Sequence, residues 1–345
     1  MNETQTATID PAATSVRPRV LSGMQPTGKL HLGNYLGALK QWVEKQDERD
    51  NIFCIVDLHA LTLPESIDPK ILKQNSRNVA ALYMAAGIDP HKSLLFIQSH
   101  LHEHSELAWI LNCVTPLGWL QRMTQFKSKG KGAQGVGSGL LVYPVLQAAD
   151  ILLYDTELVP VGEDQVQHIE LTRDVATRFN HLFGDVFVLP KATVPEFGAR
   201  VMGFDEPEMK MSKSVAAGRS GHAVHLLDED STIKKTVMSA VTDSGRETRF
   251  EYASPGVRNL LSLYQTLRGV SLAEVEEKFA GSGYGDLKKG VLEAVLDTVG
   301  PIRRRYDEII AQPQMLDDIL EMGAQSARAL ARPTLERVKA AVGVG

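Results

Sequence analysis

Short apolar runs alternate with helix-type patterns through the first two thirds of the chain. The apolar runs cover residues 20–21, 52–56, 94–97, 158–161 and 186–189. Strands that are buried on both faces of a parallel sheet have this composition. Apolar positions with helical spacing cover residues 35–46, 69–87, 105–114, 143–154 and 165–183. The alternation predicts an α/β fold with a doubly wound parallel sheet of the Rossmann type.

The pattern changes after about Ser214, and from Asp228 onward strand-like runs are almost absent. Helical spacing then covers residues 258–267, 272–279, 287–310 and 315–330. Because Gly and Ser cluster over residues 214–222, we place a domain boundary there. The predicted parts are a disordered leader over 1–18, a Rossmann-type domain over 19–218 and a helical domain over 219–345. The last helix is a candidate for packing back on the Rossmann-type domain.

Composition narrows the class of protein. The chain has 345 residues and a net charge of −5, so a nucleic-acid partner would need a local basic patch. No apolar run approaches the roughly 18 residues that span a membrane. The leader is rich in Thr and Ala and lacks the apolar core of a signal peptide. We therefore expect a cytoplasmic protein. Cys54 and Cys113 form no Cys-x-x-Cys motif, which argues against a structural metal, and we expect both to be buried.

One short segment near the start suits a phosphate. Residues 25–34 follow the first apolar run and open a helical pattern, and a helix N-terminus offers free N–H groups. Gly33 removes a side chain where a nucleotide approaches, while His31 and Asn34 are spaced to face one ligand. On the local sequence alone, an ordinary polar helix cap explains these residues equally well.

A second segment, Lys210-Met211-Ser212-Lys213-Ser214, lies far along the chain in a stretch with Gly203, Pro207 and Gly218. Its two ammonium groups can neutralise the oxygens of a leaving pyrophosphate. A lysine pair by itself is more often a solvated surface feature. The presence of both segments in this order favours a nucleotide-triphosphate site.

The two segments resemble the HIGH-type and KMSKS signatures of class I aminoacyl-tRNA synthetases. Stretches 143–152, 159–165, 168–174, 199–202 and 239–244 are similar to bacterial tryptophanyl-tRNA synthetases. The similarity runs from about Val20 to the C-terminus, so only the leader lies outside it.

By position, this resemblance implies three groups of site residues. The residues expected to contact ATP are Gln25, Pro26, Thr27, Gly33, Asn34, Gly162, Glu163, Asp164, Gln165, Val201, Lys210, Met211, Ser212, Lys213 and Ser214. Those expected to act in the phosphate chemistry are His31, Asn34, Lys210 and Lys213. Those expected in a tryptophan pocket are Asp150, Tyr143, Gln147 and Gly23.

The role of Asp150 also makes chemical sense. An indole N–H is a donor without acceptor capacity, and a buried carboxylate is a strong acceptor for it. Phenylalanine would leave the site's polar group unpaired, which corresponds to selectivity of about 10⁴–10⁵. Gln147 and Tyr143 lie one and two turns before Asp150 on a helical pattern, so they share its face. Gln147 is a departure, since some family members have methionine there.

The resemblance implies a two-step reaction with ATP, L-tryptophan and tRNA(Trp). The tryptophan carboxylate attacks the α-phosphorus of ATP, and a terminal tRNA ribose hydroxyl then takes the acyl group. Mg²⁺ is expected to arrive with the ATP phosphates and not in a protein cage. The resemblance also implies a homodimer, with the anticodon read by the helical domain. Candidate tRNA contacts are Arg303-Arg304-Arg305, Lys288-Lys289, and Lys127, Lys129 and Lys131.

Two rival functions and two decoy motifs remain at this point. The rivals are a tyrosyl-tRNA synthetase and a nucleotide-dependent regulator that has lost tRNA charging. Residues 130–135 match a dinucleotide fingerprint, but no strand pattern precedes them. His100, His102 and His104 alternate in a way that suits a metal site about one time in ten, since no carboxylate–histidine support can be inferred.

Overall fold

The structure is a computed structural model that describes residues 17–62, 64–129, 137–193 and 201–345. Side chains are outside this description for Ser66, Ser128, Lys129, Lys213, Ser214 and Ala217. The predicted leader, apart from its last two residues, and the 130–135 decoy therefore lie outside the described residues. So do Lys131 and the first two residues of the similar stretch 199–202.

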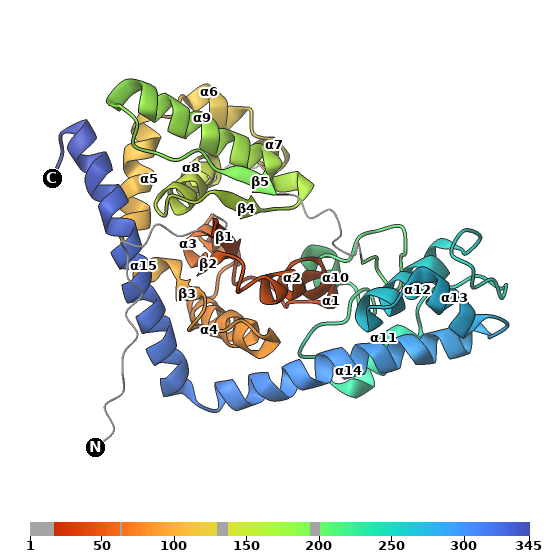
Figure 1. Cartoon of the computed structure of the whole chain (residues 1–345). Helices are drawn as coiled ribbons and strands as arrows, with labels where there is room; N and C mark the ends of the chain where they lie inside the picture. Colours follow the sequence, from red (N-terminus) through yellow and green to blue (C-terminus); the bar gives the residue numbers. More distant parts are fainter. Residues whose placement is uncertain (1–16, 63, 130–136, 194–200) are drawn as a thin grey trace, which may run out of the picture.

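Five parallel strands form one sheet in the order β3-β2-β1-β4-β5 (Figure 1). The strands are β1 (Arg19–Met24), β2 (Asp50–Ile55), β3 (Leu94–Ile97), β4 (Leu158–Pro160) and β5 (Lys191–Thr193). Each neighbouring pair is parallel. This confirms the predicted parallel sheet.

The prediction of a strand over residues 186–189 is wrong, because the last strand begins at Lys191. The Asn180 side chain accepts hydrogen bonds from the N–H groups of Val186 and Phe187 and donates one to the Phe187 carbonyl. Backbone groups of the apolar run are thereby used by the preceding helix, α9 (Val166–Phe183), and not by a neighbouring strand.

Helices connect the strands and cover both faces of the sheet (Figure 1). They are α1 (Leu32–Asn34), α2 (Lys40–Glu44), α3 (Asp57–Ala60), α4 (Pro69–Ala86), α5 (Glu103–Val114), α6 (Leu117–Gln121), α7 (Thr124–Lys129), α8 (Gly139–Leu152) and α9. A π-helical segment, η1 (Tyr35–Leu39), joins α1 to α2, and 3₁₀ turns occur at η2 (Pro64–Ser66), η3 (Gln98–His100) and η4 (Glu163–Gln165). The helix predicted over 69–87 begins at the cap Asp68 and ends at Gly87, whose φ of 116° is left-handed.

The rest of the described chain is helical, as the pattern after Asp228 predicts. It contains α10 (Lys213–Gly218), α11 (Asp230–Met238), α12 (Pro255–Arg268), α13 (Leu272–Phe279), α14 (Tyr284–Ile310) and α15 (Pro313–Val342). The last helix runs through Pro333, well past the predicted end at residue 330. Proline removes one helical hydrogen bond, but buried Ala331 and Leu335 hold the helix on both sides of it against the core.

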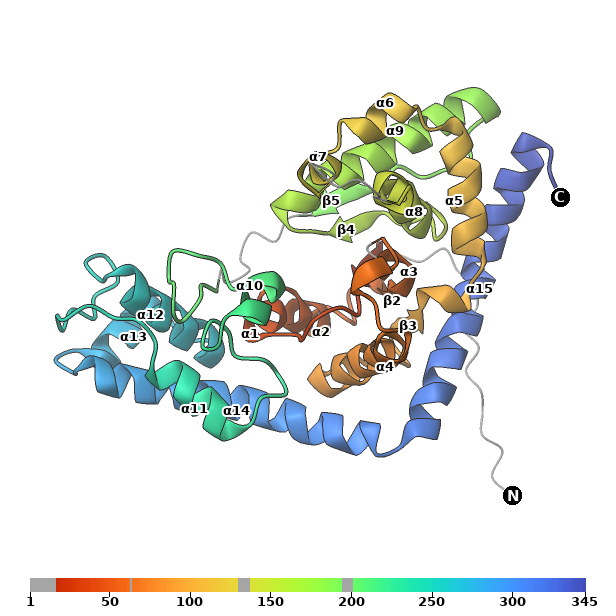
Figure 2. The ribbon, with the colours of Figure 1, turned by 180° about the vertical axis from the view of Figure 1, so that it is seen from behind.

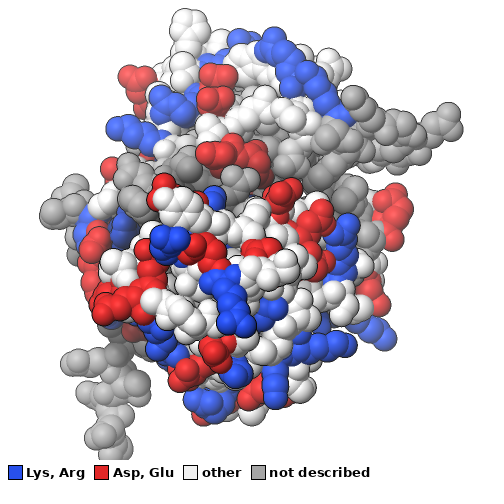
Figure 3. All heavy atoms as spheres, turned by 90° about the vertical axis from the view of Figure 1, so that its right-hand side faces the viewer, with Lys and Arg blue, Asp and Glu red and all other residues white. Residues whose placement is uncertain are grey.

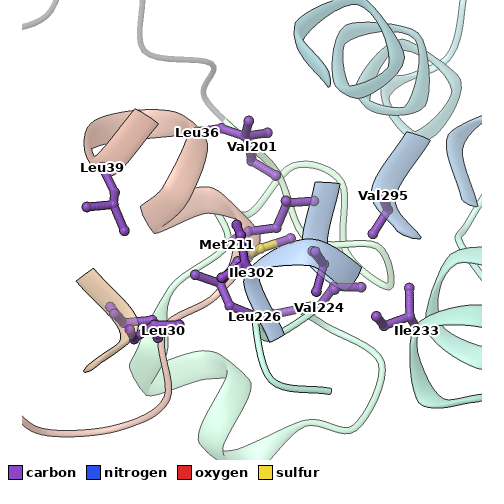
Figure 4. Close-up of a cluster of buried hydrophobic side chains, with 14 of the residues drawn as sticks. Leu30, Leu36, Leu39, Val201, Met211, Val224, Leu226, Ile233, Val295 and Ile302 are labelled. Carbon is purple, nitrogen blue, oxygen red and sulfur yellow. The ribbon is translucent and has the colours of Figure 1, made fainter. Parts of the chain in front are cut away.

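Two hydrophobic clusters fill the interior. One joins a face of the sheet to α4, to the loop around Met211 and to α11–α14, so the helical part shares a core with the sheet. Figure 4 shows part of this cluster, with Leu36 next to Val201, Met211 near the middle of the view, and Leu30 and Leu39 to one side. The other cluster packs α5, α8, α9 and α15 on the opposite face.

The two longest helices frame the molecule. Figures 1 and 2 show α14 running beneath α4, α11 and α12, and α15 turning sharply to lie along the sheet and α5. At the contact with the sheet, a β-carbon on Gly323 would lie 2.0 Å from the carbonyl oxygen of Leu95 in β3. Only glycine therefore lets α15 approach this strand so closely.

Surface features change one expectation, the burial of Cys113. Lys and Arg are interspersed with Asp and Glu on the face that Figure 3 presents, so charges of both signs reach the solvent there. Cys54 is buried as expected, but the prediction for Cys113 is wrong because it is exposed on α5. Among the described residues, no helix combines the length and apolar character needed to cross a membrane.

Candidate active site

The strand order favours a ligand site between β1 and β4. The strand order reverses between β1 and β4, because β2 and β3 lie on one side of β1 and β4 and β5 lie on the other. Open parallel sheets bind ligands beyond the carboxyl ends of the strands at such a reversal. Residues 25–30 leave β1 at this edge, and residues 162–165 leave β4 at the same edge. Both predicted nucleotide-contacting loops therefore begin at one side of the sheet.

The first motif is held as a capped helix start. His31 is 2% exposed, and its Nδ1 accepts a hydrogen bond from the Asn34 N–H at 3.2 Å. The Asn34 side-chain oxygen accepts from the His31 N–H at 3.1 Å. Leu32 donates its N–H to the Val224 carbonyl at 2.8 Å. The polar-cap interpretation is thus correct for the local geometry, and it also fixes where the helix begins.

The second motif begins in a backbone loop, called the strap below, whose two arms are residues 201–203 and 209–211. Met211 donates its N–H to the Val201 carbonyl at 3.0 Å, and Gly203 donates to the Met209 carbonyl at 2.8 Å. Asn259 on α12 bonds both backbone groups of Met202 at 3.1 Å. Residues 201–203 and 209–211 are therefore anchored to the helical part, with Lys210 exposed.

Tertiary packing brings the two motifs together. A β-carbon on Gly33 would lie 3.6 Å from the β-carbon of Met211, so the start of α1 rests directly against the second motif. Met211 itself is 2% exposed. Helix α10, which begins at Lys213, consequently lies next to α1 (Figure 1). The side chains of Lys213 and Ser214 are outside the description, so their predicted contacts stay predictions.

The remaining predicted nucleotide residues are placed at the same edge of the sheet. Pro26 and Val201 are buried, whereas Gln25, Thr27 and Gly162–Asp164 are exposed. Gln165 donates a hydrogen bond to Asp164 at 2.8 Å. A β-carbon on Gly162 would lie 2.8 Å from the same Asp164 carboxylate, an exposed side chain that would have to turn aside to make room for it.

Asp150 lies deep in the molecule, with 2% of its surface exposed. Its Oδ1 accepts hydrogen bonds from Gln98 Nε2 and His104 Nδ1, each at 2.7 Å. Its Oδ2 contacts His59 Nε2 at 2.8 Å. Burial by itself raises the pKa of Asp150, but hydrogen bonds from His104 and His59 outweigh it and lower the pKa to about 2. The group is therefore a carboxylate at neutral pH.

The other pocket candidates lie on α8 and β1, and one of them, Tyr143, lies near a residue that contacts this carboxylate. The Tyr143 ring lies 6.3 Å from the His59 ring, and its hydroxyl is 2.6 Å from His168 Nε2. Gln147 is half-buried and makes no hydrogen bond to another described residue. Gly23, at the end of β1, packs against Val56, where a β-carbon would lie 3.3 Å from Cγ1.

Comparisons with known proteins show the family to which the chain belongs. A family model described as "tRNA synthetases class I (W and Y)" matches residues 14–299. The tryptophan–tRNA ligase of Caldanaerobacter subterraneus is 51% identical over 327 residues, which are 94% of this chain and 98% of that protein. Tryptophan–tRNA ligase 2 of Streptomyces avermitilis is 49% identical over 333 residues, covering 95% of this chain and 98% of that protein. The chain belongs to the tryptophan–tRNA ligases, which are class I aminoacyl-tRNA synthetases.

A solved member of the tryptophan–tRNA ligases has the same fold. The crystal structure of tryptophanyl-tRNA synthetase from Campylobacter jejuni, complexed with ADP and tryptophan, has a TM-score of 0.83 and 38% identity. The match covers 94% of this chain and all of that one, 100%. The parallel sheet and the helical part are therefore common to both proteins.

Three of the residues around Asp150 are not among the pocket residues that the sequence predicts: His59, Gln98 and His104. His59 follows the end of β2, and Gln98 follows the end of β3. The rule that ligand sites form beyond the carboxyl ends of parallel strands could have identified both. His104 was considered only as a metal ligand, whereas its ring contacts Asp150. The other two histidines of the alternating set, His100 and His102, do not share this position. His102 is exposed, and His100 lies on a 3₁₀ turn.

The cationic candidates for tRNA contact differ in how far they are exposed and in whether they are already paired within the protein. Arg303 is engaged by Asp230 at 2.6 Å and by the carbonyl of Asp228, so it ties α14 to α11. Arg304 and Arg305 are exposed. Lys289 is exposed and pairs with Asp286 at 3.1 Å.

Proposed function

We propose that the chain activates L-tryptophan with ATP to tryptophanyl-adenylate and transfers the amino acid to the 3′ end of tRNA(Trp). The observation that carries the tryptophan preference is the buried Asp150 carboxylate. A carboxylate offers about four acceptor positions, and three donors already occupy three of them. One position remains on Oδ2, which matches the single N–H donor of an indole.

ATP is proposed to lie over the edge of the sheet between β1 and β4. Residues 25–27 with Gly33 and Asn34 hold the phosphates, residues 162–165 hold the ribose and adenine side, and Val201 contacts adenine through its backbone. The contact between Gly33 and Met211 supports this proposal, since it places the two phosphate-binding segments against each other. Met211, Ser212 and Ser214 then position the closing loop.

The first chemical step forms a bond between a tryptophan carboxylate oxygen and the α-phosphorus while the bond to the β-phosphate oxygen breaks. The amino-acid carboxylate is already ionised at pH 7, so no general base is needed. Lys210 and Lys213 neutralise the charge that grows on the leaving pyrophosphate, and His31 and Asn34 position the phosphates. Mg²⁺ enters as part of the ATP substrate complex. Among the described residues, no group of three or more His, Cys, Asp or Glu side chains is placed to hold a metal ion.

Residues 219–345 are proposed to read the tRNA anticodon, in a cytoplasmic enzyme. The exposed cations Arg304 and Arg305 on α14 support this, because phosphate contacts need accessible Lys or Arg. Lys289 on the same helix is also exposed, although it pairs with Asp286. We expect a triple alanine variant at these positions to keep tryptophan-dependent pyrophosphate exchange and to raise the KM for tRNA in aminoacylation. Unchanged aminoacylation would remove these three residues from the tRNA surface.

The chain is also proposed to work as a homodimer. Trp109 on α5 is 71% exposed and Leu117 on α6 is 57% exposed, an apolar surface that a second copy can cover. Light scattering with size-exclusion chromatography should give twice the chain mass, and Trp109→Lys should give the monomer mass. A single-chain mass for the unaltered protein would contradict the dimer.

Pyrophosphate exchange with each of the twenty amino acids tests the activity itself. Exchange with tryptophan alone is the expected result. Exchange with tyrosine would select the tyrosyl-tRNA synthetase alternative, and no exchange with any amino acid would select the non-synthetase alternative. Charging of purified tRNA(Trp) in a second assay then tests the transfer step.

A further inference from the structure

A chain of hydrogen bonds runs from Tyr154 through His104 to Asp150. The Tyr154 hydroxyl lies 2.8 Å from His104 Nε2, and His104 Nδ1 lies 2.7 Å from Asp150 Oδ1. The exposed fractions of Tyr154 and His104 are both 0%. Neither side chain can therefore reach solvent, and each polar atom depends on its partner in this chain.

The groups around these hydrogen bonds determine which atom is the donor in each of them. Burial raises the pKa of Tyr154 well above its usual value, and the negative charge of Asp150 adds to this, so the hydroxyl keeps its proton. Burial likewise raises the pKa of the Cys54 thiol, which stays neutral. A protonated hydroxyl donates to Nε2, which then accepts, and Nδ1 carries the proton that faces Asp150. Phe96 stacks at 6.0 Å from both rings and restricts their rotation.

The tautomer of His104 determines which oxygen of Asp150 keeps an open acceptor position. With the proton on Nδ1, His104 and Gln98 together saturate Oδ1. The open acceptor position is then confined to Oδ2, beside His59. With the proton on Nε2, His104 would face Asp150 with a lone pair, and the carboxylate would be free to turn or to take a different donor.

We propose that Tyr154 and His104 are positioning residues that fix the Asp150 carboxylate with one acceptor open, and so set the selection for a side chain carrying an N–H donor. The proposal rests on the proposed function, since it assumes that Asp150 Oδ2 receives the indole N–H. The Tyr154 hydroxyl is three hydrogen bonds away from the substrate, with His104 and Asp150 in between, and it touches nothing that reacts.

The experiment measures a discrimination ratio. The ratio compares kcat/KM in pyrophosphate exchange for L-tryptophan with that for its benzothiophene analogue, in which sulfur replaces the indole N–H. We expect Tyr154→Phe to lower this ratio by about tenfold, mainly through a higher KM for tryptophan, while kcat changes little. Tyr83→Phe is the matched control: Tyr83 is equally buried, and its hydroxyl has no hydrogen-bond partner among the described residues. Its ratio should equal that of the unaltered chain.

Three outcomes separate the explanations. If Tyr154→Phe lowers kcat/KM equally for both substrates, the tyrosine has only a structural role and the proposal is overturned. If the unaltered chain does not prefer the N–H substrate, the proposed function of Asp150 fails first. If tryptophan is preferred and both phenylalanine variants keep that preference, the positioning proposal alone is wrong.

A second measurement avoids the risk that Tyr154→Phe does not fold. Ring-nitrogen NMR of ¹⁵N-histidine-labelled protein reads the tautomer of His104 directly, assigned with His104→Asn, whose amide can still donate to Asp150. We expect a protonated Nδ1 and an unprotonated Nε2 in the unaltered protein. A proton on Nε2 with Nδ1 bare would overturn the proposal.

Discussion

Gly33 and Met211 touch across the candidate active site, although they belong to motifs at opposite ends of the sheet-forming part of the chain. A β-carbon on Gly33 would be 3.6 Å from that of Met211 and 3.1 Å from His31 Nδ1. The second of these separations is tighter than most side-chain contacts. The separation from Met211 is an ordinary van der Waals contact between the two motifs, and the tight contact is the one with His31 inside the first motif.

Replacing Gly33 by alanine should damage ATP use and leave folding nearly intact. The added carbon pushes the His31 ring away and weakens its bond to the Asn34 N–H at 3.2 Å. We expect about a tenfold lower kcat/KM for ATP in pyrophosphate exchange, as ligand geometry shifts by a fraction of an ångström. Gly37→Ala is the control, because a β-carbon there meets nothing within 4 Å. Equal effects of the two variants would contradict the packing argument.

Gly203→Ala should disturb the strap that carries the second motif. A β-carbon there would lie 2.3 Å from Cε1 of His222, whose Nδ1 contacts Asp205 at 2.6 Å. Because the buried ring must move, we expect a loss of about 2 kcal/mol in unfolding free energy and a higher KM for ATP. Urea titration and steady-state exchange measure the two effects. Gly218→Ala, with nothing near its β-carbon, should change neither.

Gly323→Ala should loosen α15 from the sheet. The β-carbon would overlap the Leu95 carbonyl oxygen at 2.0 Å, and this neighbour is backbone that cannot turn aside. We expect the unfolding free energy to fall by about 3 kcal/mol, at the upper end of overpacking effects. Gly285→Ala in α14 has open space and should be neutral or slightly stabilising. Chemical denaturation of both variants checks this, and equal stabilities would show that α15 tolerates a displacement.

Asp150→Asn should remove the part of the pH dependence of the unfolding free energy that comes from titration of the Asp150 carboxyl group. The pKa of Asp150 is about 2 in the folded chain against a usual 3.8. A lowered pKa stabilises the folded chain above the unfolded pKa, and that stabilisation disappears as the pH falls through the folded pKa. The stability difference between the unaltered chain and the variant should be constant above about pH 4. Between about pH 4 and pH 2 it should shrink by on the order of 2 kcal/mol.

Urea denaturation at several pH values between 5 and 2.5 measures that difference. The absolute stability of the variant is not the readout, because His59, His104 and Gln98 lose a partner at every pH. A difference that stays flat down to pH 2.5 would show that the carboxylate is not stabilised by its donors.

Much of the sheet could be predicted, because strands buried on both faces consist of consecutive apolar residues and this pattern is visible in the local sequence. Continuous apolar runs marked β1 to β4, and helical spacing marked the helices that cover them. The same logic failed at residues 186–189, where Phe187 packs against Phe179 of α9 and Asn180 uses the backbone groups, while Val188 and Leu189 are exposed. An apolar run therefore records neither the burial of each side chain nor the backbone partner that the segment finds.

By itself, the sequence determined the parallel α/β class, the two motif segments and a buried acidic residue on α8, because each depends on residue types close together in the chain. Only the tertiary structure decided that Gly33 meets Met211 and that Gln98, His59 and His104 converge on Asp150. Strand order brings the ends of β2 and β3 to one edge, where their side chains can share one carboxylate. Such a convergence depends on the three-dimensional path of the chain, and no local pattern of residues contains it.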